Sequence, residues 1–220
     1  MTKNKENQSV KTPRRGRPLR GTEDARRAKL LAAAEDMFLE HGFSASMDDI
    51  AKAAGVSKKT IYGCVDTKEK LFEAVMQARI AGSHISKLPE AVTKVSEIED
   101  ALVQFFCELA RFALSPVSVR LFRAVVGESA RFPEIAATYY REGPAHMVKS
   151  LATWFALLAQ QGLIALDDPA EAAAILGGGI VAAPLRSLAL GVTKHWTEAE
   201  IERRARMTVR LFLKGALLQR

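Results

Sequence analysis

The sequence predicts an all-α protein, and three observations lead to this prediction. After residue 21, apolar residues recur at intervals of three and four, as they do on the buried face of a helix. No segment alternates apolar and polar residues with the Val-, Thr- and Tyr-rich composition of a strand. Capping residues, glycines and prolines divide the helical pattern into about nine helices.

Four helices are expected in the first third of the chain. Thr22 and Ser57 are the expected N-caps of the first and third helices. Asp66 is the expected cap of the fourth, in a capping box closed by Glu69. Gly42 is expected to end the first helix, because glycine accepts the left-handed conformation of a C-cap. The four helices are therefore placed from 22 to 42, at 47–54, at 58–63 and from 66 onward.

The rest of the chain is expected to form a second, larger helical region, and prolines or capping residues mark where several of its helices begin. A proline is tolerated in the first turn of a helix because the backbone N–H groups there have no helical acceptor, so its missing N–H costs no hydrogen bond. Gly143-Pro144 is expected to kink one helix, and Gly162 is expected to end it. The expected helices cover 97–114 and begin at Pro116, Pro133, Pro169 and Thr197.

The net charge of +7 comes entirely from the N-terminal end. Residues 1–29 hold ten Lys and Arg against three acidic residues, and the rest of the chain is balanced. Such a basic end is attracted to a polyanion, either nucleic acid or an anionic membrane. Residues 1–21 offer only Val10 and Leu19 as large apolar residues after Met1, so nucleic acid is the favoured partner.

Composition excludes several other classes of protein. We expect no membrane partner, because apolar runs such as residues 180–183 fall far short of the ~18 apolar residues of a spanning helix. No apolar stretch follows the charged and polar N-terminus, so no secretory signal is expected and the expected location is the cytoplasm. Cys64 and Cys107 are expected to be thiols there, rather than a disulfide.

The sequence offers no pattern for catalysis, a metal or a cofactor, and none is expected. The four histidines are scattered, without His-x-x-x-His, Glu-x-x-His or Cys-x-x-Cys spacing. Residues 177–179, three consecutive glycines, lack the Lys-Ser/Thr of a phosphate-binding loop. A close contact between helices, including one at a dimer interface, is the better explanation for these glycines.

The stretch from Met47 to Ile61 has the pattern of a helix-turn-helix. Ala51 would allow two helices to cross closely, and Gly55 would take the positive φ of a tight turn. Val56 and Ile61 would fill the core between the helices, so the second helix could lie in the major groove of DNA. A surface hairpin with solvated lysines is the alternative. The polar side chains left facing outward are Ser57, Lys58, Lys59, Thr60 and Tyr62.

These residues, with Gly42-Phe43, Lys68-Glu69 and Leu71-Phe72, closely resemble the N-terminal domain of the tetracycline-repressor (TetR/AcrR-like) family. The resemblance covers about residues 22–75. It implies an all-α homodimer with a three-helix DNA-binding domain and a larger helical domain for ligand binding and dimerisation. It also implies that residues 57–62 form the recognition helix, that Ser46 donates to a phosphate and that Lys68 clamps the DNA backbone. Val65 would fill a core position where the family often has a larger residue.

On this resemblance the chain divides into a flexible basic arm at 1–21, a DNA-binding domain at 22–66 and a ligand-binding and dimerisation domain at 67–220. The expected effector is a mostly apolar or aromatic small molecule. Charged residues on these helices, Arg111, Arg120, Arg123 and Glu128, would orient a polar group of it or be solvated. Seven mostly aromatic residues of this domain are expected either to pack in its core or to line a ligand cavity: Phe105, Phe106, Leu109, Phe112, Phe122, Trp154 and Phe155.

The arm contains Arg14, Arg15 and Arg17 around Gly16 and before Pro18. The segment Arg-Gly-Arg-Pro resembles an AT-hook, which lies in the narrow minor groove of A·T-rich DNA. A generic basic tail is the alternative. Either form would add salt-dependent affinity for DNA.

The leading hypothesis is a ligand-responsive transcriptional regulator, a repressor that binds a palindromic operator of double-stranded DNA as a dimer and is released by an inducer. The alternative is a DNA-architectural protein that binds A·T-rich DNA without a ligand. A third hypothesis, an enzyme or carrier that has lost DNA binding, conflicts with the intact polar residues at 57–62.

Overall fold

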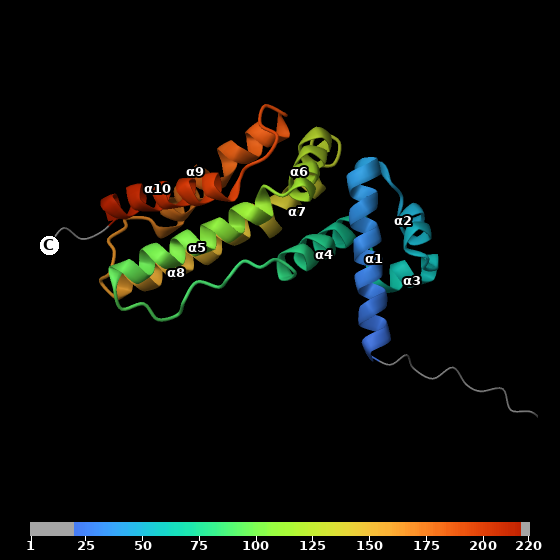
Figure 1. Cartoon of the computed structure of the whole chain (residues 1–220). Coiled ribbons are helices and arrows are strands. Elements are labelled where there is room, and N and C mark those ends of the chain that lie inside the picture. Colours follow the sequence, from blue (N-terminus) through green and yellow to red (C-terminus); the bar gives the residue numbers. More distant parts are fainter. Residues whose placement is uncertain (1–19, 217–220) are drawn as a thin grey trace, which may run out of the picture.

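The computed structural model describes residues 20–216, which fold entirely into helices and connecting loops, without a strand in that range. The first helices form a group, here called the head, at one end of an elongated molecule (Figure 1). Its order is α1 (Arg20–His41), a 3₁₀ turn η1 (Gly42–Ser44), α2 (Met47–Ala54) and α3 (Lys58–Cys64). The next helix, α4 (Lys68–Ala81), leads from the head into the rest of the chain.

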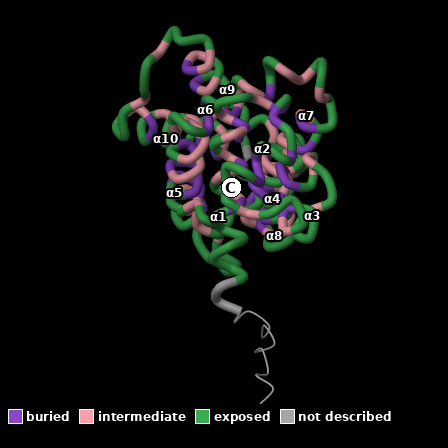
Figure 2. The backbone as a smooth tube through the Cα atoms, turned by 90° about the vertical axis from the view of Figure 1, so that its right-hand side faces the viewer, coloured by how far each residue is buried: buried purple, intermediate pink, exposed green. Residues whose placement is uncertain are grey.

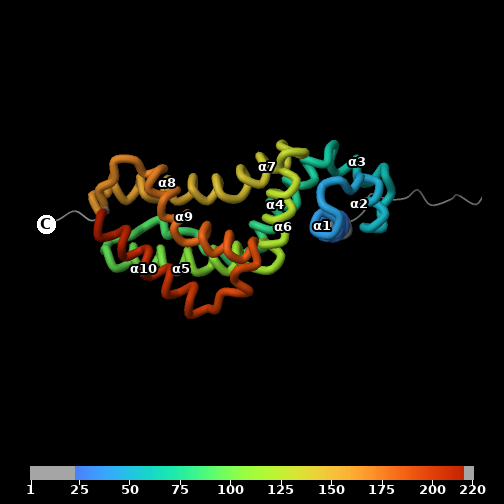
Figure 3. The backbone as a smooth tube through the Cα atoms, turned by 90° about the horizontal axis from the view of Figure 1, so that it is seen from above, coloured from blue at the N-terminus to red at the C-terminus, as the bar shows by residue number. Residues whose placement is uncertain are grey.

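The other end of the molecule is a bundle of longer helices. It contains α5 (Val95–Ala113), α8 (His146–Gln160), α9 (Pro169–Ala189) and α10 (Glu198–Ala216). Between head and bundle lie α6 (Pro116–Glu128) and α7 (Pro133–Tyr140), as the view from above shows (Figure 3). The π-helical turn Arg141–Ala145 joins α7 to α8, so the described residues form nine continuous helices.

Three helix starts differ from the sequence prediction. Helix α1 begins at Arg20, so Thr22 lies inside it and is not its cap. Helix α4 is capped by Thr67, not by Asp66, because Thr67 is the extended residue and its hydroxyl accepts from the amide of Lys70. Helix α5 begins at Val95, two residues earlier than expected.

Other breaks fall where the sequence predicts them. Gly42, Gly55 and Gly162 all have positive φ at the ends of helices. Around Pro144, where the sequence predicts a kink, the regular α-helical pattern is interrupted by a π-helical turn that contains this proline. Both cysteines are free thiols, Cys64 exposed and Cys107 buried.

Two apolar cores stabilise the fold, and the buried segments line the inward sides of the helices (Figure 2). The bundle core is built from α5, α8, α9 and α10. The head core contains a cluster of three fully buried rings, Phe38, Phe43 and Phe72, whose centroids are 5.0–5.6 Å apart. Leu121, Val125 and other residues of α6 and α7 belong to the same core, and Val65 packs against it as predicted. The head core therefore continues past residue 66.

Helix α9 is long and apolar enough to cross a membrane by length and composition. It passes on its average hydropathy, because Ala and Gly make up much of its 21 residues, and it contains no continuous run of the ~18 apolar residues expected of a spanning helix. In the structure α9 packs against α5, α6, α8 and α10. Its membership of this folded bundle explains its apolar composition.

The glycines of α9 allow the close helix contacts that the sequence suggests. A Cβ on Gly177 would meet the Met147 side chain of α8, and one on Gly179 would lie 3.3 Å from Thr208 of α10. Pro184 leaves the carbonyl of Ile180 without its helical donor. The guanidinium of Arg204 from α10 donates to this carbonyl and to that of Gly179, which ties the two helices together.

Helix α6 connects the bundle to the head through charged side chains. Arg123 donates to the carbonyls of Leu188 and Ala189 at the end of α9. Glu128 accepts from the amide of Phe43 at 3.0 Å, and Arg120 reaches the carbonyl of Leu39 at 3.5 Å. Arg120 and Arg123 are exposed to solvent, one of the two expectations for them, and they also make these contacts between distant segments. A role of these residues in orienting a ligand stays a prediction.

A second connection runs through Arg79 of α4. Its guanidinium is only 13% exposed, forms an ion pair with Glu35 of α1 and donates to the Ser118 hydroxyl of α6 at 2.8 Å. It also lies over the ring of Phe112, 5.3 Å from the centroid. The head, α4, α5 and α6 therefore meet at one partly buried cation.

We predict that Glu128→Ala loosens the junction between α6 and the head. The amide of Phe43 would lose its acceptor, at a cost of about 1–3 kcal/mol for a buried unpaired donor. Hydrogen–deuterium exchange of residues 42–46 is expected to accelerate. Glu128→Gln keeps an acceptor oxygen and should stay close to the parent, as should the exposed Glu134→Ala. Unchanged exchange in Glu128→Ala would show that the contact does not hold the loop.

Candidate nucleic-acid interface

The candidate interface is built on the turn between α2 and α3. Gly55 adopts φ 66° and ψ 31°, a left-handed conformation that costs glycine little. The amide of Val56 donates to the carbonyl of Ala51 at 3.0 Å, which closes the turn. Ala51 and Ile61 are buried, as the sequence predicts, so the turn presents α3 as a rigid unit on the head.

Helix α2 begins with a complete capping box. The Ser46 hydroxyl accepts from the amide of Asp49 at 3.2 Å, and the Asp49 carboxylate accepts from both the amide and the hydroxyl of Ser46. These bonds hold the pKa of Asp49 below its usual value. The structure thus places Ser46 at the first turn of α2 as expected, with its hydroxyl exposed but already bonded within the chain. Its contact with a phosphate stays a prediction.

The N-terminus of α3 carries the other predicted residues. The Ser57 side chain caps the helix by accepting from the amide of Thr60, and the two hydroxyl groups lie 2.8 Å apart. Lys59 is exposed and Tyr62 is 43% exposed. Five of the predicted DNA-contacting residues, 57–60 and 62, are therefore brought together on one short helix.

Lys58 has a partner that sequence reasoning missed. Its ammonium lies 2.7 Å from the Asp48 carboxylate at the start of α2, and this pairing raises the pKa of Lys58. The two residues are ten positions apart in the sequence. Only the turn at Gly55 brings the first residues of α2 and α3 together, so no local spacing rule could reveal the pair.

Lys68 differs from the other predicted residues because it faces inward. Its ammonium donates to the carbonyl of Phe43 and, at 3.4 Å, to that of Ala45, and it lies 5.1 Å from the centroid of the Phe132 ring. These contacts hold the same loop that Glu128 grips from α6. A clamp on the DNA backbone stays a prediction for this residue. Arg14, Arg15 and Arg17 lie outside the described residues.

The aromatic residues predicted to line a ligand cavity occupy two settings. Phe105, Phe106, Trp154 and Phe155 are buried in the bundle core, against which Leu109 packs. The half-buried Phe112 and Phe122 lie outside that cluster, where Phe112 meets Arg79 and Phe122 lies 6.2 Å from the ring of Tyr139. Two surface hollows of the described residues, one along α10 and one beside α3 and α4, are lined by other residues. Ligand binding by these residues stays a prediction.

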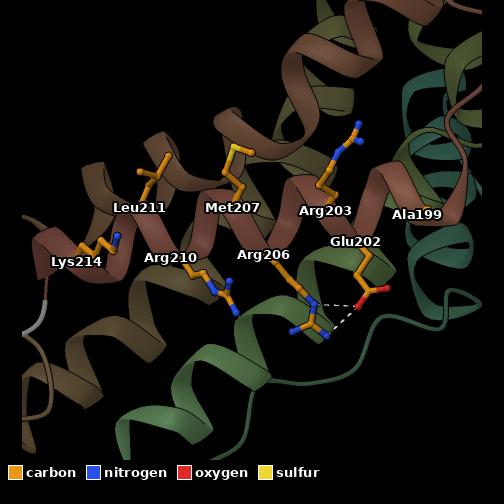
Figure 4. Close-up of a pocket in the computed structure, with 8 residues that line it drawn as sticks. All are labelled: Ala199, Glu202, Arg203, Arg206, Met207, Arg210, Leu211 and Lys214. Atoms are coloured by element: carbon orange, nitrogen blue, oxygen red, sulfur yellow. Dashed lines mark hydrogen bonds and ion pairs between the residues drawn. The ribbon is translucent and has the colours of Figure 1, made fainter.

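The larger hollow is an open groove of about 600 Å³ along α10 (Figure 4). Met207 and Leu211 point to one side of the helix, while Arg206 and Arg210 point to the other. Arg206 is paired with Glu202 within the helix, and Arg210 is paired with Glu99 of α5. The groove thus combines uncovered apolar side chains with partly neutralised charge.

Two family models match this chain. The first, for bacterial regulatory proteins of the tetR family, matches residues 30–75, the part that carries the helix-turn-helix. The second, for the C-terminal domain of AefR-like transcriptional repressors, matches residues 100–215, more than half of the chain.

Curated relatives match the N-terminal part. The transcriptional activator FasR of Mycolicibacterium smegmatis (strain ATCC 700084 / mc(2)155) is 43% identical over 58 residues, which are 26% of this chain and 26% of FasR. The regulator YvaF of Bacillus subtilis (strain 168) is 40% identical over 53 residues, 24% of this chain and 28% of YvaF. The chain therefore matches about a quarter of the length of each of these relatives.

Solved structures match over nearly the whole chain. A TetR-family transcriptional regulator from Mesorhizobium loti MAFF303099 has a TM-score of 0.74 and 27% identity, covering 91% of this chain and all of that one. The flavonoid-responsive regulator FrrA has a TM-score of 0.73 and 32% identity, covering 90% of this chain and all of that one. With its helix-turn-helix head and helical bundle, the chain belongs to the TetR family of DNA-binding transcriptional regulators, which are not enzymes.

Proposed function

We propose that this protein is a cytoplasmic repressor that binds a palindromic operator as a homodimer and leaves it when a small molecule binds the bundle. The observation that carries the proposal is the polar face of α3, where capped backbone, two lysines and a tyrosine are exposed on a rigid turn. An N-terminal helix turn of this kind fits the major groove, and its donors suit phosphates and base edges.

The match of the larger domain supports repression in particular. Residues 100–215 match a model named for repressors, whereas the relative named an activator matches only 58 residues. Regulation by an effector is carried by the bundle, so the name of its family model is the more informative of the two.

Two copies of the chain would pair through the uncovered side of α9 and α10. Ile175, Met207 and Leu211 are 64%, 58% and 67% exposed, an unusual state for large apolar residues on packed helices. The exposed Gly178 on α9 would let a second copy approach closely. A two-fold axis here would place one head on each side, and the recognition helices would meet half-sites one turn of DNA apart (~34–36 Å).

An apolar effector with aromatic rings would suit this bundle. The solved structure with 32% identity is named a flavonoid-responsive regulator, and the bundle of this chain is rich in aromatic side chains. Because Phe105, Phe106, Trp154 and Phe155 are packed in the bundle core, the effector would select a bundle conformation that opens between α5, α6 and α8. Release of DNA requires that the effector bind this conformation more tightly than the DNA-bound one.

The alternative, an architectural protein that binds A·T-rich DNA through its basic arm, predicts a different competition experiment. Any A·T-rich duplex would then displace an operator equally well. The family membership of the bundle favours the repressor, because the architectural role gives that domain nothing to bind.

We predict that replacing Lys58, Lys59 and Tyr62 together with alanine abolishes sequence-selective binding. The loss removes phosphate and base contacts from both heads of the dimer. Footprinting on the promoter region upstream of the gene, with gel shifts against specific competitor DNA, measures the effect. The matched control replaces two exposed lysines and an exposed tyrosine outside the head, Lys149, Lys194 and Tyr140, with alanine. Persistence of a protected inverted repeat in the head variant would contradict the proposal.

We predict that Met207→Arg with Leu211→Arg converts the dimer to a monomer. The new charges would face their own copies across the two-fold axis, and like charges in a buried interface are destabilising. Light scattering after size exclusion should change from twice 24.1 kDa to 24.1 kDa. Val126→Arg, at another exposed apolar site on α6, is the control. A parent protein that is already monomeric at micromolar concentration would rule out this interface.

We predict that a flavonoid panel contains compounds that stabilise the protein and weaken its operator binding. Ligand at about 100 times its Kd adds about 2.7 kcal/mol of stability. For a chain of this size that raises the Tm by roughly 5–10 °C. Phe122→Ala should reduce the shift, while Val126→Ala on the same helix should preserve it. If stabilising compounds leave operator affinity unchanged, they bind without acting as inducers.

A further inference from the structure

The ion pair between Asp48 and Lys58 lies on the surface that would face DNA. Asp48 comes from the first turn of α2, and Lys58 is the first residue of α3. Their charged atoms are 2.7 Å apart, and the side chains are 54% and 66% exposed. The lysine that stands first on the expected recognition helix is therefore already bound to an acid of the same head.

The two neighbouring acids at the start of α2 have different partners. Asp49 completes the capping box with Ser46 and is needed for the helix start. Asp48 makes no bond to the backbone cap, and its described hydrogen bond and ion pair go to Lys58. An exposed ion pair of this kind adds little to the stability of a fold. Asp48 also lies in the acidic first turn of α2, where a negative charge favours the helix dipole. Its one described side-chain bond, however, goes to Lys58 and not to α2.

We propose that Asp48 is a positioning residue for DNA recognition: it holds Lys58 in one orientation and neutralises its charge, so that the head gains little affinity from DNA of arbitrary sequence. This inference rests on the proposed function. It assigns a specificity role to an acidic residue that lies beside the recognition helix.

The physical basis is the counterion release that dominates non-specific binding. Each lysine that neutralises a phosphate makes the slope of log affinity against log salt concentration steeper by about 0.9. At 0.15 M salt, relative to 1 M salt, this slope corresponds to roughly fivefold higher affinity. A lysine held by Asp48 withholds that gain on any phosphate backbone. On the operator, a lysine already oriented toward a base edge loses less side-chain freedom, so the specific complex keeps its affinity.

The test compares Asp48→Asn with the parent on the selected operator and on a random-sequence duplex of equal length. We expect affinity for the random duplex to rise roughly fivefold per head, with a salt dependence steeper by about 0.9 per head. Affinity for the operator should rise less, so the ratio between the two falls. Glu40→Gln removes the same charge from an exposed acid of α1 and is the matched control.

A double-mutant cycle with Lys58→Ala shows whether Asp48 acts through Lys58. If it does, the gain from Asp48→Asn in the Lys58→Ala background falls to that of Glu40→Gln. An equal gain in both backgrounds would mean general repulsion of DNA and would overturn the proposal. So would unchanged binding of Asp48→Asn to the random duplex. If the parent protein binds the operator no more tightly than the random duplex, the proposed repressor function is wrong. The effect of Asp48→Asn on affinity for the random duplex would still test the role of Asp48.

Discussion

The loop between α1 and α2 is the point on which the arrangement of the head depends. Phe43 fills the centre of the head core with Phe38 and Phe72. Its amide donates to Glu128 of α6, and its carbonyl accepts from Lys68 of α4. The backbone of one residue is thus held by two helices outside the three-helix head, while its ring is held inside it. A movement of α6 or α4 would be transmitted to the start of α2, and through the turn at Gly55 to α3.

Helix α6 is suited to that transmission because its side chains form hydrogen bonds with the bundle on one side and with the head on the other. Arg123 binds the last carbonyls of α9, the helix that we propose to lie at the dimer interface. Glu128, five residues later, binds the head. A path of direct contacts therefore connects α9 to the surface that we propose to read DNA, and Arg79 supplies a parallel connection through α4. Such contacts provide the physical continuity that an allosteric regulator needs, although coupling itself is a free energy between two states.

In our proposal, the arrangement of charge on the head separates affinity from selectivity. Basic residues at the N-terminal end of the chain would favour any DNA, whereas Asp48 would restrain Lys58 on the proposed recognition helix. A regulator that searches a genome depends on the ratio of specific to non-specific binding and not on affinity alone. In our proposal, the acidic side chain of Asp48 raises this ratio by lowering the affinity for DNA of arbitrary sequence.

The sequence by itself determined the helical class, most of the helix ends and the residues of the helix-turn-helix. These depend on local physics: a glycine at positive φ, a serine cap, a proline in the first turn and the spacing of apolar residues along one helix. Only the tertiary structure decided which charged residues form bonds between distant helices and loops. Glu128 and Phe43 are 85 positions apart, and Lys68 turns inward although its sequence context resembles a phosphate clamp. Local spacing carries no information about such partners, because each bond forms only after the apolar cores have brought distant helices together.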